Sequence, residues 1–178
     1  MTEEKTQEIK MDMQAIMEVY KKLAVPGEPH KLLAGRTGSW STRNRYWTEP
    51  DKPPVESAGA CERKMLLDGR YLQEEFTGEM MGGPFAGIGI TGYDNQSGKY
   101  VMAWIDSLST GIYFFEGSAG ADGRSIMMES HMNDPVKGPM TWRGVIKLVD
   151  DNTEVFDMRA TDKNGKEERC ETTYTRTN

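Results

Sequence analysis

The sequence predicts an all-β protein: an antiparallel up-and-down β-barrel of about ten strands with an N-terminal α-helix. Three observations predict it. Hairpin turn residues recur regularly after position 37, the segments between them alternate apolar and polar residues, and no helical crossover separates these segments. Strands joined directly by hairpins are antiparallel, and closure into a barrel removes the exposed edges that a long meander would leave.

The N-terminal region has a helical pattern instead. Residues 3–24 place their apolar side chains at steps of three and four, which makes one stripe on a helix: Ile9, Met13, Ile16, Tyr20 and Leu23. The Pro-Gly pair after this segment ends it, and residues 28–34 are expected to form a second short helical turn. We therefore divide the chain into an N-terminal helical segment, 1–34, and a β-barrel domain, 35–178.

The turn signals are residues that tolerate positive φ, such as the Asp-Gly and Asn-Gly pairs. From position 95 they recur near residues 109, 122, 136, 151 and 164. This spacing leaves about ten residues for each strand, a length that suits the tilted strands of a barrel. The expected strands are 37–48, 56–67, 70–80, 84–93, 99–107, 111–118, 124–133, 139–149, 153–161 and 166–176.

Apolar residues occupy every second position within these segments. In 99–107, Tyr100, Met102 and Trp104 share a face that ends at Asp106. The same alternation selects the candidate interior residues: Met65, Phe76, Met80, Met102, Trp104, Phe115, Met128, Met132, Trp142, Phe156 and Met158. Flexible thioethers and aromatic rings suit an adaptable ligand pocket, and they fill an irregular core equally well.

The composition excludes several classes of function. The 178 residues include 28 acidic and 22 basic side chains, a net charge of −6, and such a surface repels nucleic acid. No stretch approaches the ~18 apolar residues of a membrane helix, and the first residues do not resemble a signal peptide. Two cysteines, Cys61 and Cys170, are too few for a disulfide framework. We expect a cytoplasmic protein with no nucleic-acid or membrane partner.

The stretch GIGITG, Gly87 to Gly92, has the spacing of a nucleotide-binding loop. A phosphate-binding G-x-G-x-x-G lies between a strand and a helix, because the phosphates rest on the helix N-terminus. Here the chain continues into another expected strand. We therefore interpret Gly87 and Gly89 as strand positions without side chains, where the sheet bends or a ligand approaches.

Two motifs at the ends of the expected barrel resemble lipocalins and related calycin barrels. Gly38-Ser39-Trp40 opens the first strand, and Tyr174-Thr175-Arg176 closes the last. In those barrels the Trp of a G-x-W motif closes the floor, and an Arg of the last strand packs on its ring. The resemblance implies a cation–π contact between Arg176 and Trp40.

A more extensive resemblance covers roughly residues 28–176. Four motifs occur in order: HKLLAGRTGSW, FTGEMMGGPFAGIGITGYDN, KYVMAWIDSLSTG and the closing TYTR. This ordered set resembles the bacterial family called domain of unknown function 1579. The resemblance implies a calycin-like barrel and carries no established activity or catalytic residues.

A distant resemblance is to nitrobindin, a ten-stranded haem barrel with a short helix before its first Trp and a proximal His near its C-terminus. This chain has Cys170 and Tyr174 in that region and no His after His131. His131 lies on the opposite face of its expected strand from Met128 and Met132, so we expect it to point outward. His30 precedes the barrel, and no His or Cys that could bind a metal together with it is close in the sequence. We therefore expect no haem, no other cofactor and no metal site.

Three functional hypotheses remain. The first is a binding protein for a small, largely apolar molecule, with these ligand-binding candidates: Trp40, Met102, Trp104, Trp142, Phe156, Met158 and Tyr174. The second is an isomerase or lyase on the same barrel that uses inward carboxylates as acid or base, with Glu75, Glu79 and Asp106 as candidates. The third is a filled barrel that acts through its surface in a protein assembly, where the N-terminal helix would pair with a second copy.

The sequence favours the first hypothesis over an enzyme, because it contains no nucleophile motif such as G-x-S-x-G. Cys170 alternates with Thr172 and Tyr174 and is interpreted as a small buried residue. For Asp106 a simpler interpretation stands beside the acid–base one, namely a strand end whose carboxylate satisfies backbone donors of the following turn.

Overall fold

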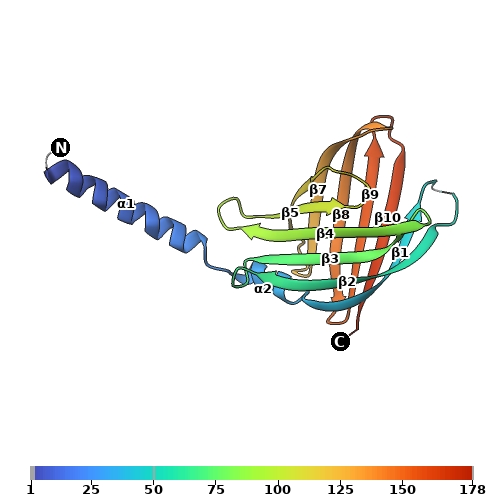
Figure 1. Cartoon of the computed structure of the whole chain (residues 1–178), viewed down its shortest axis with the longest axis horizontal. Coiled ribbons are helices and arrows are strands. Elements are labelled where there is room, and N and C mark those ends of the chain that lie inside the picture. Colours follow the sequence, from blue (N-terminus) through green and yellow to red (C-terminus); the bar gives the residue numbers. More distant parts are fainter. Residues whose placement is uncertain (1–2, 50, 178) are drawn as a thin grey trace.

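The expected fold is confirmed by the structure, a computed structural model that describes residues 3–49 and 51–177. Two helices precede a closed barrel of ten antiparallel strands (Figure 1). Each strand pairs with the next along the chain, and β10 closes the barrel against β1. The helices are α1 (Glu3–Leu23) and α2 (Glu28–Ala34). The strands are β1 (Gly38–Trp47), β2 (Val55–Leu66), β3 (Tyr71–Met80), β4 (Gly83–Asp94), β5 (Lys99–Asp106), β6 (Tyr113–Ala119), β7 (Ser125–Asp134), β8 (Gly138–Asp150), β9 (Thr153–Asp162) and β10 (Glu167–Arg176).

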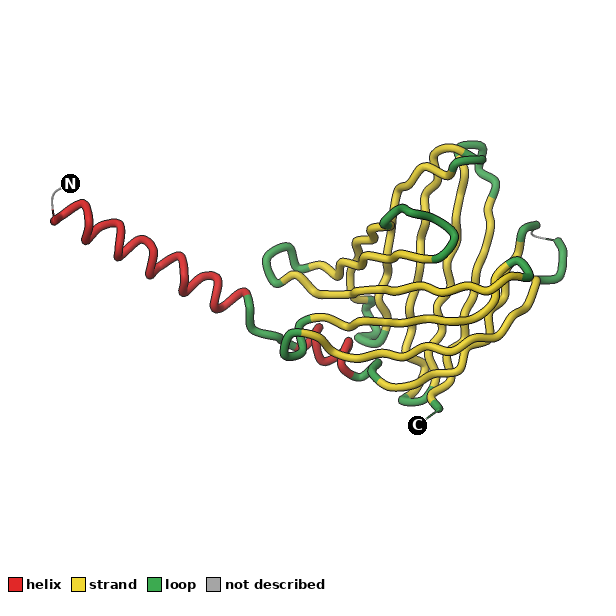
Figure 2. Tube along the Cα trace, in the orientation of Figure 1, coloured by secondary structure: helices red, strands yellow, loops and turns green. Residues whose placement is uncertain are grey.

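The barrel is flattened, so that β2–β5 run across the direction of β7–β10 (Figure 1). Figure 2 shows that short loops join the strands at both ends of the barrel and that α1 extends away from it. Among the described residues no helix is both long and apolar enough to cross a membrane.

One parity of each strand faces the interior. The register places Trp40 of β1 opposite Cys61 of β2, and Cys61 opposite Phe76 of β3, and all three are buried. The neighbouring parity on β1 carries the charged Arg43 and Arg45. Because side chains alternate between the two faces of a strand, this register sets the facing of the other positions.

The helix α2 covers one end of the barrel. Its Leu33 is fully buried in a cluster with Leu72, Tyr100 and Ile126, which lie where β3, β5 and β7 begin. The Tyr100 hydroxyl donates a hydrogen bond to the Pro29 carbonyl oxygen (3.3 Å). The short second helix expected at 28–34 is therefore part of the barrel core and closes its floor.

The opposite end, where β1 ends at Trp47 and β5 ends at Asp106, is called the mouth below. Interior side chains near it keep accessible surface: Trp104, Trp142 and Met158 are half-buried, whereas Leu33 and Tyr100 at the floor are at most 1% exposed. Other interior side chains near the mouth, such as Met140 and Phe85, are buried, so the accessible surface is confined to part of this end.

The GIGITG stretch lies inside β4, and no helix follows it, as expected. Its first two glycines face the interior opposite Asp106 and Trp104 of β5. A Cβ at Gly87 would lie 2.1 Å from Trp104 Cζ2, and one at Gly89 would lie 3.1 Å from Cε3. The missing side chains make room for the indole of Trp104, which lies against the wall of the barrel.

We expect Gly87→Ala to destabilise the protein by about 1–3 kcal/mol, because the new methyl group would displace a rigid ring from its place on the wall. Gly83→Ala, on the same strand, is the matched control, since a Cβ there meets only the Met80 carbonyl oxygen at 3.9 Å. Urea denaturation of the two variants measures the difference. Equal stability of both variants would contradict this account of Gly87.

Candidate functional site

The seven residues expected to bind ligand all face the barrel interior, at three depths. Trp40 and Tyr174 are buried at the floor. Met102 and Phe156 lie between the floor and the mouth, and Trp104, Trp142 and Met158 lie near the mouth. Met102, Trp142 and Met158 pack on the Leu33 cluster, whereas Trp104 and Phe156 pack on a second cluster that contains Trp40 and Tyr174. The structure therefore brings the seven residues into one interior, divided between two packed clusters.

Trp142 contributes a polar group to this apolar wall. Its indole Nε1 is buried and has no hydrogen-bond acceptor among the described residues. Its cross-strand neighbours are the buried Ser130 of β7 and Ala160 of β9. An unsatisfied buried donor is costly, and it becomes an attractive contact for any molecule that places an acceptor there. The mouth thus combines accessible apolar surface with one directed N–H group.

The indole of Trp104 is fixed by Asp106. Its Nε1 donates to Asp106 Oδ2 (2.9 Å), and Asp106 Oδ1 accepts a hydrogen bond from the Leu108 backbone N–H (2.9 Å). Both carboxylate oxygens are thus engaged in holding a ring and a turn. Asp106 lies where the sequence predicted a strand end that satisfies backbone donors.

Glu75 and Glu79 do not lie in the interior. Both are exposed on the outer face of β3, and Glu75 accepts a hydrogen bond from Gln73 (2.6 Å). The inward carboxylate on this strand is Glu74, which forms an ion pair with Arg63. The acid–base hypothesis required Glu75 and Glu79 to point inward, so the structure removes that basis for it.

Trp40 at the floor is held by contacts with two arginine residues, near the place where β10 closes the barrel against β1. The guanidinium of Arg176 lies 4.1 Å from the ring centroid, as the lipocalin resemblance implied. Arg176 also donates to the backbone carbonyl oxygens of Gly35 (2.9 Å) and Asp151 (2.9 Å). The Trp40 indole N–H donates to the Arg36 carbonyl oxygen (3.2 Å). This floor residue is committed to closing the barrel.

A buried group of four charges lies beside this floor. Arg63 Nε contacts Glu74 Oε2 (2.6 Å), and Arg63 Nη2 lies 3.1 Å from Glu154 Oε1. Glu154 also accepts a charge-assisted hydrogen bond from Arg36 Nε (2.6 Å). Two positive and two negative groups balance, so the group has no net charge.

The arginines decide the ionisation of Glu154. Burial opposes its charge, but Arg36 and Arg63 outweigh burial and lower the pKa of the carboxyl below its ordinary value. Burial likewise opposes the charge of Arg63, and Glu74 and Glu154 raise the pKa of its guanidinium above the ordinary value. Glu154 and Arg63 therefore stay ionised at neutral pH, which suits a structural role.

Our sequence reasoning missed this charged group. Arg63 has the inward parity of Cys61 and Met65, and Glu154 has the parity of Phe156. The sequence therefore did contain a signal for this group, namely charged residues at positions that the alternation predicts to face inward. They are compatible with a barrel interior only if they pair with each other, and their pairing partners are far apart in the sequence.

The remaining reactive groups are held in their neutral forms. Burial raises the pKa of the Cys170 thiol to about 11 and that of the Cys61 thiol further still. Burial also raises the pKa of the Tyr174 hydroxyl well above its ordinary value. Neutral thiols are poor nucleophiles, so these side chains favour packing over covalent chemistry.

The two histidines lie apart. His30 is buried in α2, where burial lowers its pKa, and its Nδ1 accepts a hydrogen bond from the Gly27 backbone N–H (3.0 Å). His131 is exposed on the outer face of β7, with its Nε2 3.0 Å from Glu129 Oε1. Within the described part of the chain, no group of three or more His, Cys, Asp or Glu side chains could hold a metal ion.

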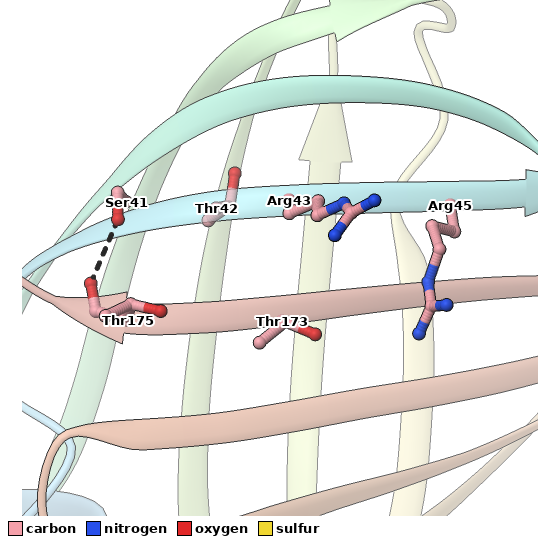
Figure 3. Close-up of a pocket in the computed structure, with 6 residues that line it drawn as sticks. All are labelled: Ser41, Thr42, Arg43, Arg45, Thr173 and Thr175. Atoms are coloured by element: carbon pink, nitrogen blue, oxygen red, sulfur yellow. Dashed lines mark hydrogen bonds between the residues drawn. The ribbon is translucent and has the colours of Figure 1, made fainter.

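Shallow hollows lie over β1, β9 and β10. One of about 280 Å³ is lined by Ser41, Thr42, Arg43, Arg45, Thr173 and Thr175 (Figure 3). Another of about 190 Å³ is lined by Trp47, Arg159, Glu167, Glu168 and Arg169. Their arginines are already paired with carboxylates, as Arg43 is with Glu56 (2.9 Å). These hollows offer neither an apolar surface nor an uncompensated charge, so we take the interior near the mouth as the candidate site.

Comparisons with known proteins agree with the fold. The model of a family described as "Protein of unknown function (DUF1579)" matches residues 25–176. The structure is similar to an S-type phycobiliprotein lyase, CPES, from Guillardia theta, with 9% identity, a TM-score of 0.58 and coverage of 83% of this chain and 92% of that chain. It is also similar to a de novo designed fluorescence-activating β-barrel, with 15% identity, a TM-score of 0.45 and coverage of 82% of this chain and 96% of that chain. No curated protein matches the chain.

We expect Glu154→Gln to lower the free energy of unfolding by about 3–5 kcal/mol, because it leaves Arg36 and Arg63 buried without their shared counter-charge. Glu56→Gln, which removes the exposed partner of Arg43, is the control and should cost far less. Urea denaturation at pH 7 measures both. A loss at Glu154 no larger than that at Glu56 would show that the buried group is not needed for stability.

The same carboxylate predicts a pH dependence. The pKa of Glu154 is lower in the folded than in the unfolded chain, so its contribution is present above the ordinary carboxyl pKa and is lost as the pH falls through the folded pKa. Between about pH 5 and pH 3, the stability of Glu154→Gln should therefore fall less than that of the unchanged protein. Glu56→Gln, on the outer face of β2, serves again as the control for an exposed carboxylate. A fall as steep in Glu154→Gln as in the unchanged protein would oppose this assignment.

Proposed function

This chain belongs to the DUF1579 family, whose description assigns no activity, and for this member we propose that the barrel binds a small, largely apolar molecule between its mouth and the floor formed by Trp40. The molecule would rest against Trp104, Trp142 and Met158 and reach towards Met102 and Phe156. It would carry at least one hydrogen-bond acceptor, which Trp142 would recognise.

One observation supports this proposal most directly. Trp142 presents a buried N–H group without a protein acceptor among the described residues, in a wall whose apolar side chains keep accessible surface. Binding sites for small molecules are mostly apolar, with a few directed polar groups. The fixed Trp104 ring adds a rigid flat surface, because Asp106 and the glycines of β4 hold it in place.

The alternatives have less support. An enzyme needs a group with a suitable pKa beside the ligand, yet Asp106 is occupied by Trp104 and Leu108, and Glu75 and Glu79 are outside. In a completely filled barrel the Trp142 donor would stay without an acceptor, as the buried Thr42 Oγ1 and Arg63 Nη1 stay without a partner among the described residues. We keep the proposals of a cytoplasmic location and reduced thiols, which rest on the composition of the chain.

The first test is to purify the unmodified protein from its native host without added ligand, denature it, and identify released small molecules by mass spectrometry. We expect a largely apolar compound with an acceptor group, present at a substantial fraction of one molecule per chain. An absorbance scan of the intact protein tests for haem independently. A protein that carries no compound and also binds none from a metabolite extract would count against the proposal.

A variant then locates the site. Trp142→Phe keeps an aromatic ring but removes the N–H group, and we expect roughly a tenfold loss of affinity for the identified compound, equal to the ~1–1.5 kcal/mol of one hydrogen bond. The matched control is Trp47→Phe, because Trp47 lies on the outer face of β1, against Arg45 and Arg169. Titration calorimetry measures both variants. Equal losses, or a loss only at Trp47, would place the site elsewhere.

A further inference from the structure

The outer face of the barrel is not uniformly polar. Over β1, β9 and β10 it carries paired charges, such as Arg169 with Asp157 (2.5 Å) and Arg159 with Glu167 (2.6 Å). Over β4, β5 and β6 it is apolar. We call this second region the β4–β6 face, and it consists of Ile88, Ile90, Val101, Ala103, Ile105 and Phe114.

The register makes the β4–β6 face continuous. Ile88 lies directly opposite Ile105, and Ala103 lies between Ile90 on β4 and Phe114 on β6. The five larger side chains of this face are 39–67% exposed. Contiguous exposed apolar patches on soluble proteins mark interaction sites more often than isolated apolar residues do. The rest of this barrel shows that its outer face can be charged, so the apolar region is a local feature.

The helix α1 has a second apolar surface without a partner among the described residues. Met13, Ile16, Met17 and Tyr20 lie at helical spacing and are 41–65% exposed. Of the two helices, α2 packs on β2, β3 and β4, whereas α1 has no comparable contact and extends away from the barrel (Figures 1 and 2). A helix with an apolar face gains most of its stability from packing that face against something.

Asn95 in the β4–β5 turn fixes the direction of α1. Its side-chain amide donates to the backbone carbonyl oxygens of Leu23 (2.7 Å) and Val25 (2.9 Å), at the end of the helix. These two hydrogen bonds hold the end of α1 at the β4–β5 turn in the orientation that points the helix away from its own barrel (Figure 1). Docking on another molecule would keep them, which favours a contact between chains.

We propose that two copies of this chain form a dimer in which α1 of each copy packs on the β4–β6 face of the other. The inference does not depend on the proposed ligand. In a dimer with a two-fold axis, the same contact forms twice. The helix α1 has 21 residues and is about 31 Å long. Stable interfaces bury ~1,200–2,000 Å² in total, and in a symmetric dimer two such contacts share that requirement.

A basic residue of α1 and two acidic residues of β3 lie beside the two surfaces. Lys21 follows Met17 by one helical turn, borders the apolar stripe of α1 and pairs with Glu18 of the same helix (2.7 Å), an ion pair that it could exchange at a contact with another chain. Glu75 and Glu79 on β3 border the β4–β6 face, opposite Ile88 and Pro84 in the register. Among the ion pairs formed by described residues none involves Glu79, so its carboxylate is available to a basic partner.

The test is sedimentation equilibrium of the full chain, of 20.1 kDa, over a range of concentrations. We expect a reversible dimer. Ile90→Glu on the sheet face and Ile16→Asp on the helix should each weaken it at least about tenfold, because each would bury a charge at the contact. Two matched controls should leave it unchanged: Ala60→Glu on the outer face of β2, and Gln14→Asp on the face of α1 opposite Ile16. Thermal melts confirm that all four variants fold.

Mixing the two weakened variants decides between modes of pairing. Ile90→Glu keeps an intact helix, and Ile16→Asp keeps an intact β4–β6 face, so a mixture restores one of the two contacts. We expect a heterodimer that is stronger than either variant alone, detected by native mass spectrometry. Pairing of helix with helix, or of face with face, would give no such recovery and would overturn the proposal. A chain that is monomeric at all concentrations would also overturn it.

Discussion

The paired charges of Arg63 and Glu154 are the interaction on which the rest of the barrel depends. They join β2 to β9, and Arg36 ties the segment before β1 to the same carboxylate. Charges removed from water are tolerated only beside their partners, and a shift of one residue in either strand would move its charged group to the outer face and leave the other buried without a partner. The pairing therefore selects one register for strands that lie on opposite sides of the closure, in a sheet whose alternation alone would permit several.

The strands were predictable from the sequence to within two residues at each end, because turn residues and the period of two are local signals. The partners of single residues were harder to predict. The predicted interior position of Phe76 already gave Glu74 the inward parity of its strand. The buried partner of Glu74, Arg63 on β2, could be found only in the structure. The role of Gly87 could not be predicted, because this glycine makes room for the ring of Trp104 on the next strand. That α2 closes one end of the barrel could likewise be recognised only from the contacts of Leu33 in three dimensions.

The interior combines a group of paired charges near the floor with apolar side chains that line the rest of the wall. The guanidinium groups of Arg63 and Arg176 lie over the rings of Tyr174 and Trp40, and Arg63 also pairs with Glu154, so this end of the barrel serves closure. Towards the mouth the side chains are methionines and indoles, which adapt to different shapes and offer polarizable contacts. In the proposed binding function, the paired ionisable groups would stabilise the fold, and the apolar side chains would contact the ligand.

The closure between β1 and β10 has a consequence for the synthesis of the protein. Trp40 pairs in register with Arg176, so one edge of β1 has no partner until β10 has been synthesised. During that time the inward face of the growing meander, with its methionines and aromatic rings, is exposed to other chains. The order of synthesis therefore leaves the apolar interior uncovered for longest in the part of the sheet that is made first.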